Sequence, residues 1–218
     1  MKQKISVILI SSGAVGCWRE VLSWEKNNQV LASVGQPVMM ARYAEKFQKR
    51  GIVTAQILPT HATLEDIESH RIQFVRTVND ILKAGVLPII NENDALSTAE
   101  MQALGRGADN DKNALLVAEY LSASDIVLIT NTNGVYSNKD DASTRIKELS
   151  SGTITESWMD TICGEKSETW TGGMHSKLAV GREFAKTGGV TYICDGVTST
   201  VYQHIMGRNI RGGTRISA

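Results

Sequence analysis

The stretch Val86–Asp94, VLPIINEND, decides the fold because it joins an apolar run to a run of amides and acids. Its first half, Val86–Ile90, is apolar throughout rather than alternating. That pattern is typical of a strand covered on both faces, as in a parallel sheet. Four further runs are apolar nearly throughout: Ile5–Ile10, Ile52–Leu58, Ile126–Thr130 and Val190–Cys194.

Helical periods lie between these predicted strands. Apolar residues recur at steps of three and four in four segments, three of which stop at a glycine. The alternation of strands and helices predicts an α/β protein, a three-layer α/β/α sandwich with a mainly parallel sheet. The polar stretch Ser137–Thr155 is expected to be a loop, and residues 1–218 are expected to form one domain. The helical positions are Met40, Tyr43 and Phe47; Val75, Val78 and Leu82; Leu115, Leu116 and Tyr120; and Leu178, Gly181 and Phe184.

The composition excludes several classes of protein. The 218 residues carry 23 basic and 23 acidic side chains, so there is no basic excess to suggest a nucleic-acid partner. The three cysteines are odd in number and far apart, which favours a reducing cytoplasm over a disulfide scaffold. No run approaches the roughly 18 apolar residues of a membrane span.

Polar turns follow three of the predicted strands: Ser11–Ala14, Asn91–Asp94 and Asn131–Gly134. Ligands of open α/β sheets bind beyond the carboxyl ends of the strands, so these turns are expected to gather at one edge. Asn, Gly and Ser are also common in turns of any function, which is the simpler reading of each turn alone. The stretch GRGADNDK, Gly105–Lys112, adds an acid–amide–acid cluster before an apolar helix, where Asp109 and Asp111 could equally act as an N-cap.

The stretch TGGMHSKL, Thr171–Leu178, has the chemistry of a phosphate site. Gly172 and Gly173 allow backbone N–H groups to approach phosphate oxygens, and they precede a predicted helix over Met174–Lys186. A helix N-terminus favours anions, and Lys177 falls in its first turn. The P-loop pattern GxxxxGK[ST] does not occur, so any phosphate binding is of another kind.

These motifs resemble those of the glutamate 5-kinases, a group within the amino acid kinase family. The resemblance runs from about residue 5 to about residue 196. PIINEND and TGGMxxK are specific signals, whereas SSGA and GVY are shared more widely in the family. The matching stretches, in family order, are SSGAVG (Ser11–Gly16), LASVGQP (Leu31–Pro37), PIINENDA (Pro88–Ala95), DND (Asp109–Asp111), GVY (Gly134–Tyr136) and TGGMHSKL.

The resemblance implies phosphorylation of the γ-carboxylate of L-glutamate by ATP with Mg²⁺, the first step towards proline. Lys177 would steady the transferred phosphoryl group and Asp111 would organise the lysines around it. No side chain is assigned to a resident metal. The implied substrate-binding residues are Ser12, Asp94 and Asn110, and the implied nucleotide-binding residues are Thr130, Asn131, Thr171, Gly172, Gly173, Met174, His175, Ser176 and Lys177.

The expected partners are L-glutamate and ATP, with no nucleic acid and no membrane. Exposed strand edges argue for a homo-oligomer. A cytoplasmic location and channelling of the product to glutamyl phosphate reductase are further expectations from the resemblance. An RNA-binding-type domain, which follows the kinase domain in many relatives, is not expected in this chain.

The chain departs from the family pattern at its start. Relatives open with a strand that carries a lysine and a Gly-Ser/Thr turn, whereas only Met1–Lys4 precedes Ile5 here. We therefore expect a missing first strand and a missing second phosphate-binding lysine. Three explanations are open: a truncated kinase, a paralogue that binds without turnover, or a partner chain that supplies the strand. Asn131 also stands where relatives usually have Asp, and a family kinase with another acceptor is a further alternative.

Overall fold

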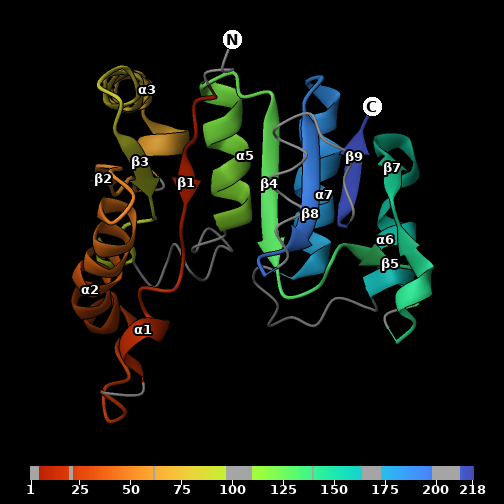
Figure 1. Ribbon diagram of the computed structural model, residues 1–218, viewed down its shortest axis with the longest axis horizontal. Helices are drawn as coiled ribbons and strands as arrows, with labels where there is room; N and C mark the ends of the chain where they lie inside the picture. The colour runs from red at the N-terminus through yellow and green to blue at the C-terminus, as the bar shows by residue number, and fades with distance from the viewer. Residues whose placement is uncertain are drawn as a thin grey trace. The chain divides into compact units, whose positions relative to one another are not determined.

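The computed structural model describes residues 5–19, 22–60, 62–96, 110–138, 140–163, 173–197 and 212–218. The chain divides into two compact units, Met1–Asn113 and Ala114–Ala218, each with its own sheet (Figure 1). α5 (Asn110–Tyr120) contains the division point. The single domain expected over residues 1–218 stays a prediction, in which these units would be its two halves.

The first unit is built on a three-stranded parallel sheet of order β1-β3-β2. β3 is the central strand, and its buried Ile89 and Ile90 pair with both neighbours. α2 packs on β2, and α3 packs on β3. The elements in chain order are β1 (Leu9–Ile10), α1 (Gly16–Arg19), α2 (Asn28–Gln48), β2 (Thr54–Ile57), a π-helical turn (Ala62–Asp66), α3 (Glu68–Lys83), β3 (Leu87–Ile90) and a 3-10 turn (Asp94–Leu96).

The helix α2 extends the predicted helix towards the N-terminus. The side chain of Asn27 caps it by accepting hydrogen bonds from the N–H groups of Gln29 and Val30, at 2.9 and 3.4 Å. Pro37 lies inside α2, so the helix begins well before Met40. The apolar period from Met40 onward therefore predicted only the C-terminal part of the helix. The buried face of α2 includes Gly35 and Gln36.

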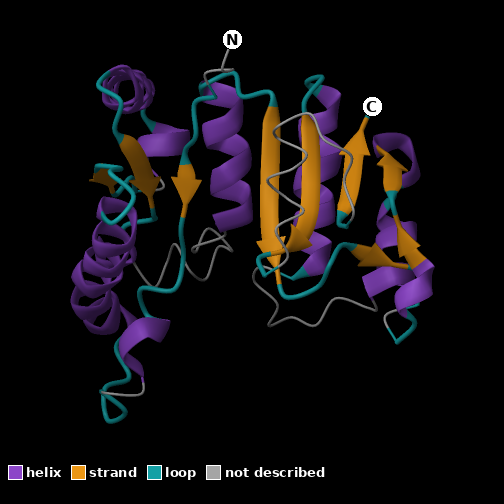
Figure 2. Ribbon diagram, in the orientation of Figure 1, coloured by secondary structure: helices purple, strands orange, loops and turns teal. Residues whose placement is uncertain are grey.

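The second unit is built on a four-stranded sheet of order β4-β8-β9-β7 (Figure 2). β4 pairs with β8 in parallel over the full length of both strands, and α7 packs on β8 and β9. The core beneath α7 includes the fully buried Leu178, Phe184 and Ile193. The elements in chain order are β4 (Asp125–Thr130), β5 (Val135–Tyr136), a 3-10 turn (Ala142–Thr144), β6 (Arg145–Ile146), β7 (Glu148–Ser150), a 3-10 turn (Ser151–Thr153), α6 (Glu156–Cys163), α7 (Met174–Lys186), β8 (Val190–Asp195) and β9 (Thr214–Ser217).

The α/β class and the mainly parallel pairing are confirmed, and all five predicted strands are present in whole or in part. The strand predicted at Ile5–Ile10 is shorter than expected, because β1 pairs with β3 only opposite Ile89 and Ile90. Ile5 and Val7 precede the paired part and are 46% and 53% exposed.

The prediction of a loop over Ser137–Thr155 is wrong. The segment contains β6, which forms an antiparallel pair with β5, and β7, which pairs in parallel with β9. β7 is polar except for the inward-facing Leu149, so its local sequence lacks the signal of a buried strand. The strand exists because β9, far along the chain, supplies its hydrogen bonds.

Candidate functional site

The turn after β1 contains two serines that the structure uses differently. Ser11 is buried, its N–H donates to the Ile90 carbonyl at 2.8 Å, and its hydroxyl lies 3.0 Å from that of Tyr43 on α2. Ser12 is exposed. The first hydroxyl therefore fastens the turn to the fold, and the second, the predicted substrate-binding residue, is left accessible to a ligand.

The loop after β3 lies beside that turn, because β1 and β3 are neighbouring parallel strands. Asn91 is 1% exposed, and its Nδ2 donates to Oε1 of Gln36 at 2.7 Å. Glu92 is 7% exposed and accepts a hydrogen bond from Asn113 Nδ2 at 3.1 Å. The loop is thus tied to both α2 and α5, and these ties hold Asp94 at the start of its 3-10 turn. Burial raises the pKa of the Asp94 carboxyl above its usual range.

The first turn of α5 contains the two described members of the acid–amide–acid cluster. Oδ1 of Asn110 is buried and has no hydrogen-bond partner among the described residues. Asp111 follows it and is partly buried, in the turn of a helix where an acid is favourable. Lys112 is held in an ion pair with Glu65 at 2.5 Å. Asp109, Gly105 and Gly107 lie outside the described residues.

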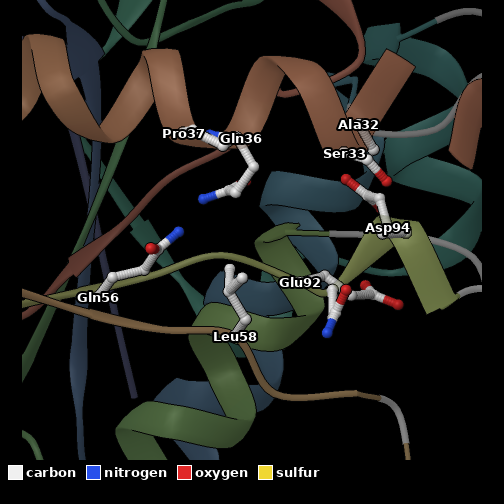
Figure 3. A pocket seen from close by; sticks show the side chains of 10 residues that line it. Ala32, Ser33, Gln36, Pro37, Gln56, Leu58, Glu92 and Asp94 are labelled. Atoms are coloured by element: carbon white, nitrogen blue, oxygen red, sulfur yellow. The ribbon is translucent and has the colours of Figure 1, made fainter. Parts of the chain in front are cut away.

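A cavity of about 240 Å³ opens between α2, the end of β2 and the loop after β3 (Figure 3). Of the predicted substrate-binding residues, Asp94 lines it. Glu92 and Asn93 belong to the polar turn Asn91–Asp94 that was expected at the ligand edge, whereas Ser33, Gln36 and Gln56 were given no role from the sequence. Gln36 had a readable signal, since it is a polar residue on the helical face of Ala32 and Met39, both buried. The lining residues are Ala32, Ser33, Gln36, Pro37, Gln56, Leu58, Glu92, Asn93, Asp94 and Ala95.

In the second unit, the predicted phosphate site falls at the N-terminus of α7. Gly173 is the N-cap, and Lys177 lies in the first turn, where its N–H donates to the Gly173 carbonyl at 3.3 Å. α7 ends at Lys186 and β8 begins at Val190, so the helix returns antiparallel to the strand on which it packs. Its N-terminus therefore lies at the edge where β4 and β8 end. Thr171 and Gly172 lie outside the described residues.

The end of β4 carries Thr130 and Asn131 to that same edge. The Thr130 hydroxyl donates to Oδ1 of Asn131 at 3.3 Å, and both residues remain accessible. The following turn is held by the C-terminal strand, because Asn133 Oδ1 accepts from the N–H of Gly213 at 2.8 Å. Thr214 continues this link by accepting from the N–H of Val135 at 2.8 Å.

Comparison with known proteins decides the family. A model described as "Amino acid kinase family" matches residues 1–195. The chain belongs to the amino acid kinase family. Glutamate 5-kinase from Hydrogenovibrio crunogenus is 30% identical over 212 residues, which cover 94% of this chain and 55% of that protein. Glutamate 5-kinase from Burkholderia mallei is 35% identical over 199 residues, which cover 87% of this chain and 52% of that protein. The chain thus spans about half the length of these curated relatives.

Solved structures confirm the amino acid kinase-like sandwich. Carbamate kinase from Giardia lamblia bound to AMP-PNP superimposes with a TM-score of 0.62 at 16% identity, covering 97% of this chain and 84% of that one. Isopentenyl phosphate kinase gives a TM-score of 0.60 at 15% identity, with the same two coverages of 97% and 84%. At these identities the likeness concerns the fold alone.

Two residues of the amino acid kinase motif TGGMHSKL turn their side chains into the fold. Met174 packs against the core of the second unit. His175 is 18% exposed in its side chain, and its Nε2 lies 3.6 Å from Glu156 Oε2 and 3.9 Å from Asp160 Oδ1 on α6. Their predicted part in nucleotide binding therefore falls to their backbone N–H groups, and it stays a prediction.

Two other kinds of site are absent from the described ranges. There, no group of three or more His, Cys, Asp or Glu side chains is placed to hold a metal ion. None of the helices described here has both the length and the apolar character needed to cross a bilayer. All three cysteines are free thiols.

Proposed function

We propose that the chain transfers the γ-phosphoryl group of ATP to the γ-carboxylate of L-glutamate, which yields L-glutamyl 5-phosphate and commits glutamate to proline synthesis. The observation that carries the proposal is the cavity at Asp94, which is small and has two carboxylates, those of Glu92 and Asp94, among its lining side chains. Its volume of about 240 Å³ lies below the ~300 Å³ at which drug-sized pockets begin, so it suits a single amino acid. The names of the relatives, 30 to 35% identical to this chain, support glutamate as that amino acid.

The acceptor side belongs to the first unit in this proposal. A carboxylate is the natural partner of an ammonium group, so Asp94 would bind the amino group of glutamate. Ser12 offers an accessible hydroxyl, and Asn110 offers an uncharged amide whose Oδ1 is buried without a partner among the described residues. A buried, unpaired acceptor is costly, and a ligand N–H group that donates to Oδ1 of Asn110 would recover part of that cost.

The donor side belongs to the second unit. The backbone N–H groups at the start of α7 would bind the phosphates of ATP, with Thr130 and Asn131 beside the nucleotide. Lys177 would place a cation against the transferred phosphoryl group, where charge is greatest in the transition state. Asp111, a residue of the first unit, would have the role of orienting the lysines, and Mg²⁺ would enter with ATP as part of the substrate.

The reaction needs positioning and cations rather than a protein nucleophile. One oxygen of the ionised γ-carboxylate attacks the γ-phosphorus, and a C–O–P linkage forms. The bond between the γ-phosphorus and the β,γ-bridging oxygen breaks, and ADP leaves with that oxygen. No proton has to be removed from the acceptor.

The proposed setting is the cytoplasm, with the chain working as a homo-oligomer. The product is an acyl phosphate, which water hydrolyses readily. This lability supports direct transfer to glutamyl phosphate reductase as the next step.

The test is ADP release from ATP and Mg²⁺ with a panel of acceptors, together with capture of the acyl phosphate as its hydroxamate. We expect turnover with L-glutamate and little with aspartate, carbamate or a nucleoside monophosphate. Turnover with another acceptor but not with glutamate would make the chain a different kinase of the family. Calorimetric binding of glutamate and ATP without turnover would instead support the paralogue that binds but does not catalyse.

A further inference from the structure

We infer that the cavity holds the α-amino and α-carboxylate end of the acceptor, and that Gln36 selects it by donating a hydrogen bond to the α-carboxylate. This inference rests on the proposed function and assigns the specificity of the same acceptor site. Gln36 would be a specificity-determining residue that touches the substrate away from the reacting carboxylate.

The inference rests on a hydrogen-bond donor that lines the cavity and has no partner among the described residues, the amide nitrogen of Gln36. Gln36 is 8% exposed, and Figure 3 shows its amide nitrogen pointing from α2 into the cavity, towards Gln56. Among the described residues, that nitrogen, Nε2, has no hydrogen-bond partner. A buried donor without a partner costs roughly 1–3 kcal/mol, so a ligand oxygen at this point would recover a real cost.

The orientation of the Gln36 amide follows from its neighbour. Nδ2 of Asn91 donates to Oε1 of Gln36 at 2.7 Å, which occupies the oxygen and leaves the nitrogen for the cavity. Asn91 is itself fixed at the end of β3, since its N–H donates to the Ile57 carbonyl at 3.2 Å. The Asn91–Gln36 bond alone orients the donor, since Oδ1 of Asn91 has no partner among the described residues.

The charges of the lining select the class of ligand. Glu92 and Asp94 are acidic, Gln36, Gln56 and Asn93 are neutral amides, and none of the described lining residues is Lys or Arg. Carboxylates attract an ammonium group, while a ligand carboxylate has to find uncharged donors. A ligand with both groups on one carbon, the head of an α-amino acid, satisfies both requirements at once.

The test compares L-glutamate with its α-carboxamide, L-isoglutamine, by calorimetry on the full chain. Gln36→Glu keeps the oxygen that Asn91 binds and replaces only the donor by an acceptor. We expect it to weaken L-glutamate binding at least tenfold and isoglutamine binding far less, so that the preference ratio falls at least tenfold. Gln36→Met removes both the amide oxygen and the amide nitrogen. It should lower the preference ratio less than Gln36→Glu, because it adds no carboxylate to repel the α-carboxylate of the ligand. Gln48→Met, an exposed glutamine on the same helix, should leave both affinities unchanged.

Affinity for ADP serves as the readout of correct folding. An unchanged preference ratio in both Gln36 variants would overturn the inference while leaving the proposed function standing. The ratio stays unchanged when both ligands lose affinity equally, which is the mark of a structural role of Gln36 or of a cavity filled by water. A parent chain that binds ADP but neither amino acid would overturn the proposed function and this inference together.

Discussion

The two units of the chain bury different kinds of side chain. The described buried polar residues of the first unit are Ser11, Gln36, Asn91 and Glu92, whereas those of the second are two threonines, Thr191 and Thr214. Burying amides and a carboxylate costs free energy unless each is paired. Two of the four in the first unit, Gln36 and Glu92, line its cavity, while the second unit has an apolar core beneath α7.

This difference suggests a division of labour between the units. Under the proposed function the first unit would recognise its ligand with side chains, so substitutions there should change which acceptor binds and how tightly. The second offers the N-terminus of a well-anchored helix, so under the same proposal most of its contribution would come from the backbone and from Lys177. Rate and recognition should therefore respond to substitutions in different units.

The largest expected effect is on rate, in Lys177→Ala. Loss of one preorganised charge from a phosphoryl-transfer site should lower kcat by ~10²–10³-fold. Glutamate affinity should stay within about twofold of the parent's, because Lys177 belongs to the second unit. Steady-state kinetics and calorimetry give the two quantities separately. Lys186→Ala, at the exposed end of the same helix, is the matched control. A loss of glutamate affinity with kcat preserved would contradict the division.

Asp94→Asn should have the next largest effect, this time on recognition. Removing a partly buried partner of an ammonium group costs ~2 kcal/mol or more, about thirtyfold in glutamate affinity. The free chain should become more stable at pH 7, because the pKa of Asp94 is raised by burial, so its charged form destabilises the fold. Urea unfolding and calorimetry should thus move in opposite directions. A decrease in both would make Asp94 a structural residue.

A smaller effect is expected from pH. Since the folded pKa of Asp94 lies above 3.8, glutamate affinity should begin to fall at a higher pH than for an ordinary aspartate. Below that pKa the loss should approach tenfold per pH unit. The ligand's own carboxylates also titrate, and they contribute equally to the profile of Asp94→Asn. The pH profile of the parent is therefore compared with the profile of that variant. If glutamate affinity fell with pH in the same way for the parent chain and for Asp94→Asn, the ionised Asp94 carboxylate would not be the partner of the ammonium group.

Local periodicity was enough to predict α7 and five of the strands that pair in parallel: β1, β2, β3, β4 and β8. The helix predicted over Met174–Lys186 has those bounds in the structure, because its apolar spacing and its flanking glycines agree. β7 and β9 were not predicted, since each is short and depends on a partner that is distant in the sequence. Long-range pairing leaves little trace in a local pattern.

The candidate site was predictable by motif but not by side-chain direction. The sequence alone does not distinguish Ser11 from Ser12. Only the contact of Ser11 with Tyr43 in the structure shows that the Ser11 hydroxyl is buried while the Ser12 hydroxyl is accessible. His175 sits inside the phosphate motif, yet its imidazole faces the acids of α6. Gln36 lies in the quoted motif LASVGQP, but its value as a donor depends on Asn91, which approaches from another strand.

The smallest expected effect compares one glycine from each unit. A Cβ at Gly35 would lie 1.9 Å from the backbone oxygen of Ala14, so α2 and the turn at Ser12 would have to separate. A Cβ at Gly181 would lie 2.5 Å from Cδ1 of Ile216, the end of a side chain that can rotate. Alanine gains up to ~1 kcal/mol of helix propensity at either site, which offsets the second clash but not the first.

Gly35→Ala should therefore be less stable than Gly181→Ala by about 1 kcal/mol, measured by native-state hydrogen exchange of α2 and α7 amides. Gly35→Ala should also weaken glutamate binding, because the displaced turn carries Ser12, while Gly181→Ala should leave it unchanged. Equal losses of stability would mean that α2 yields as easily as the Ile216 side chain. In that case the first unit would be the more adaptable of the two, and its buried amides would be oriented by the ligand rather than in advance of it.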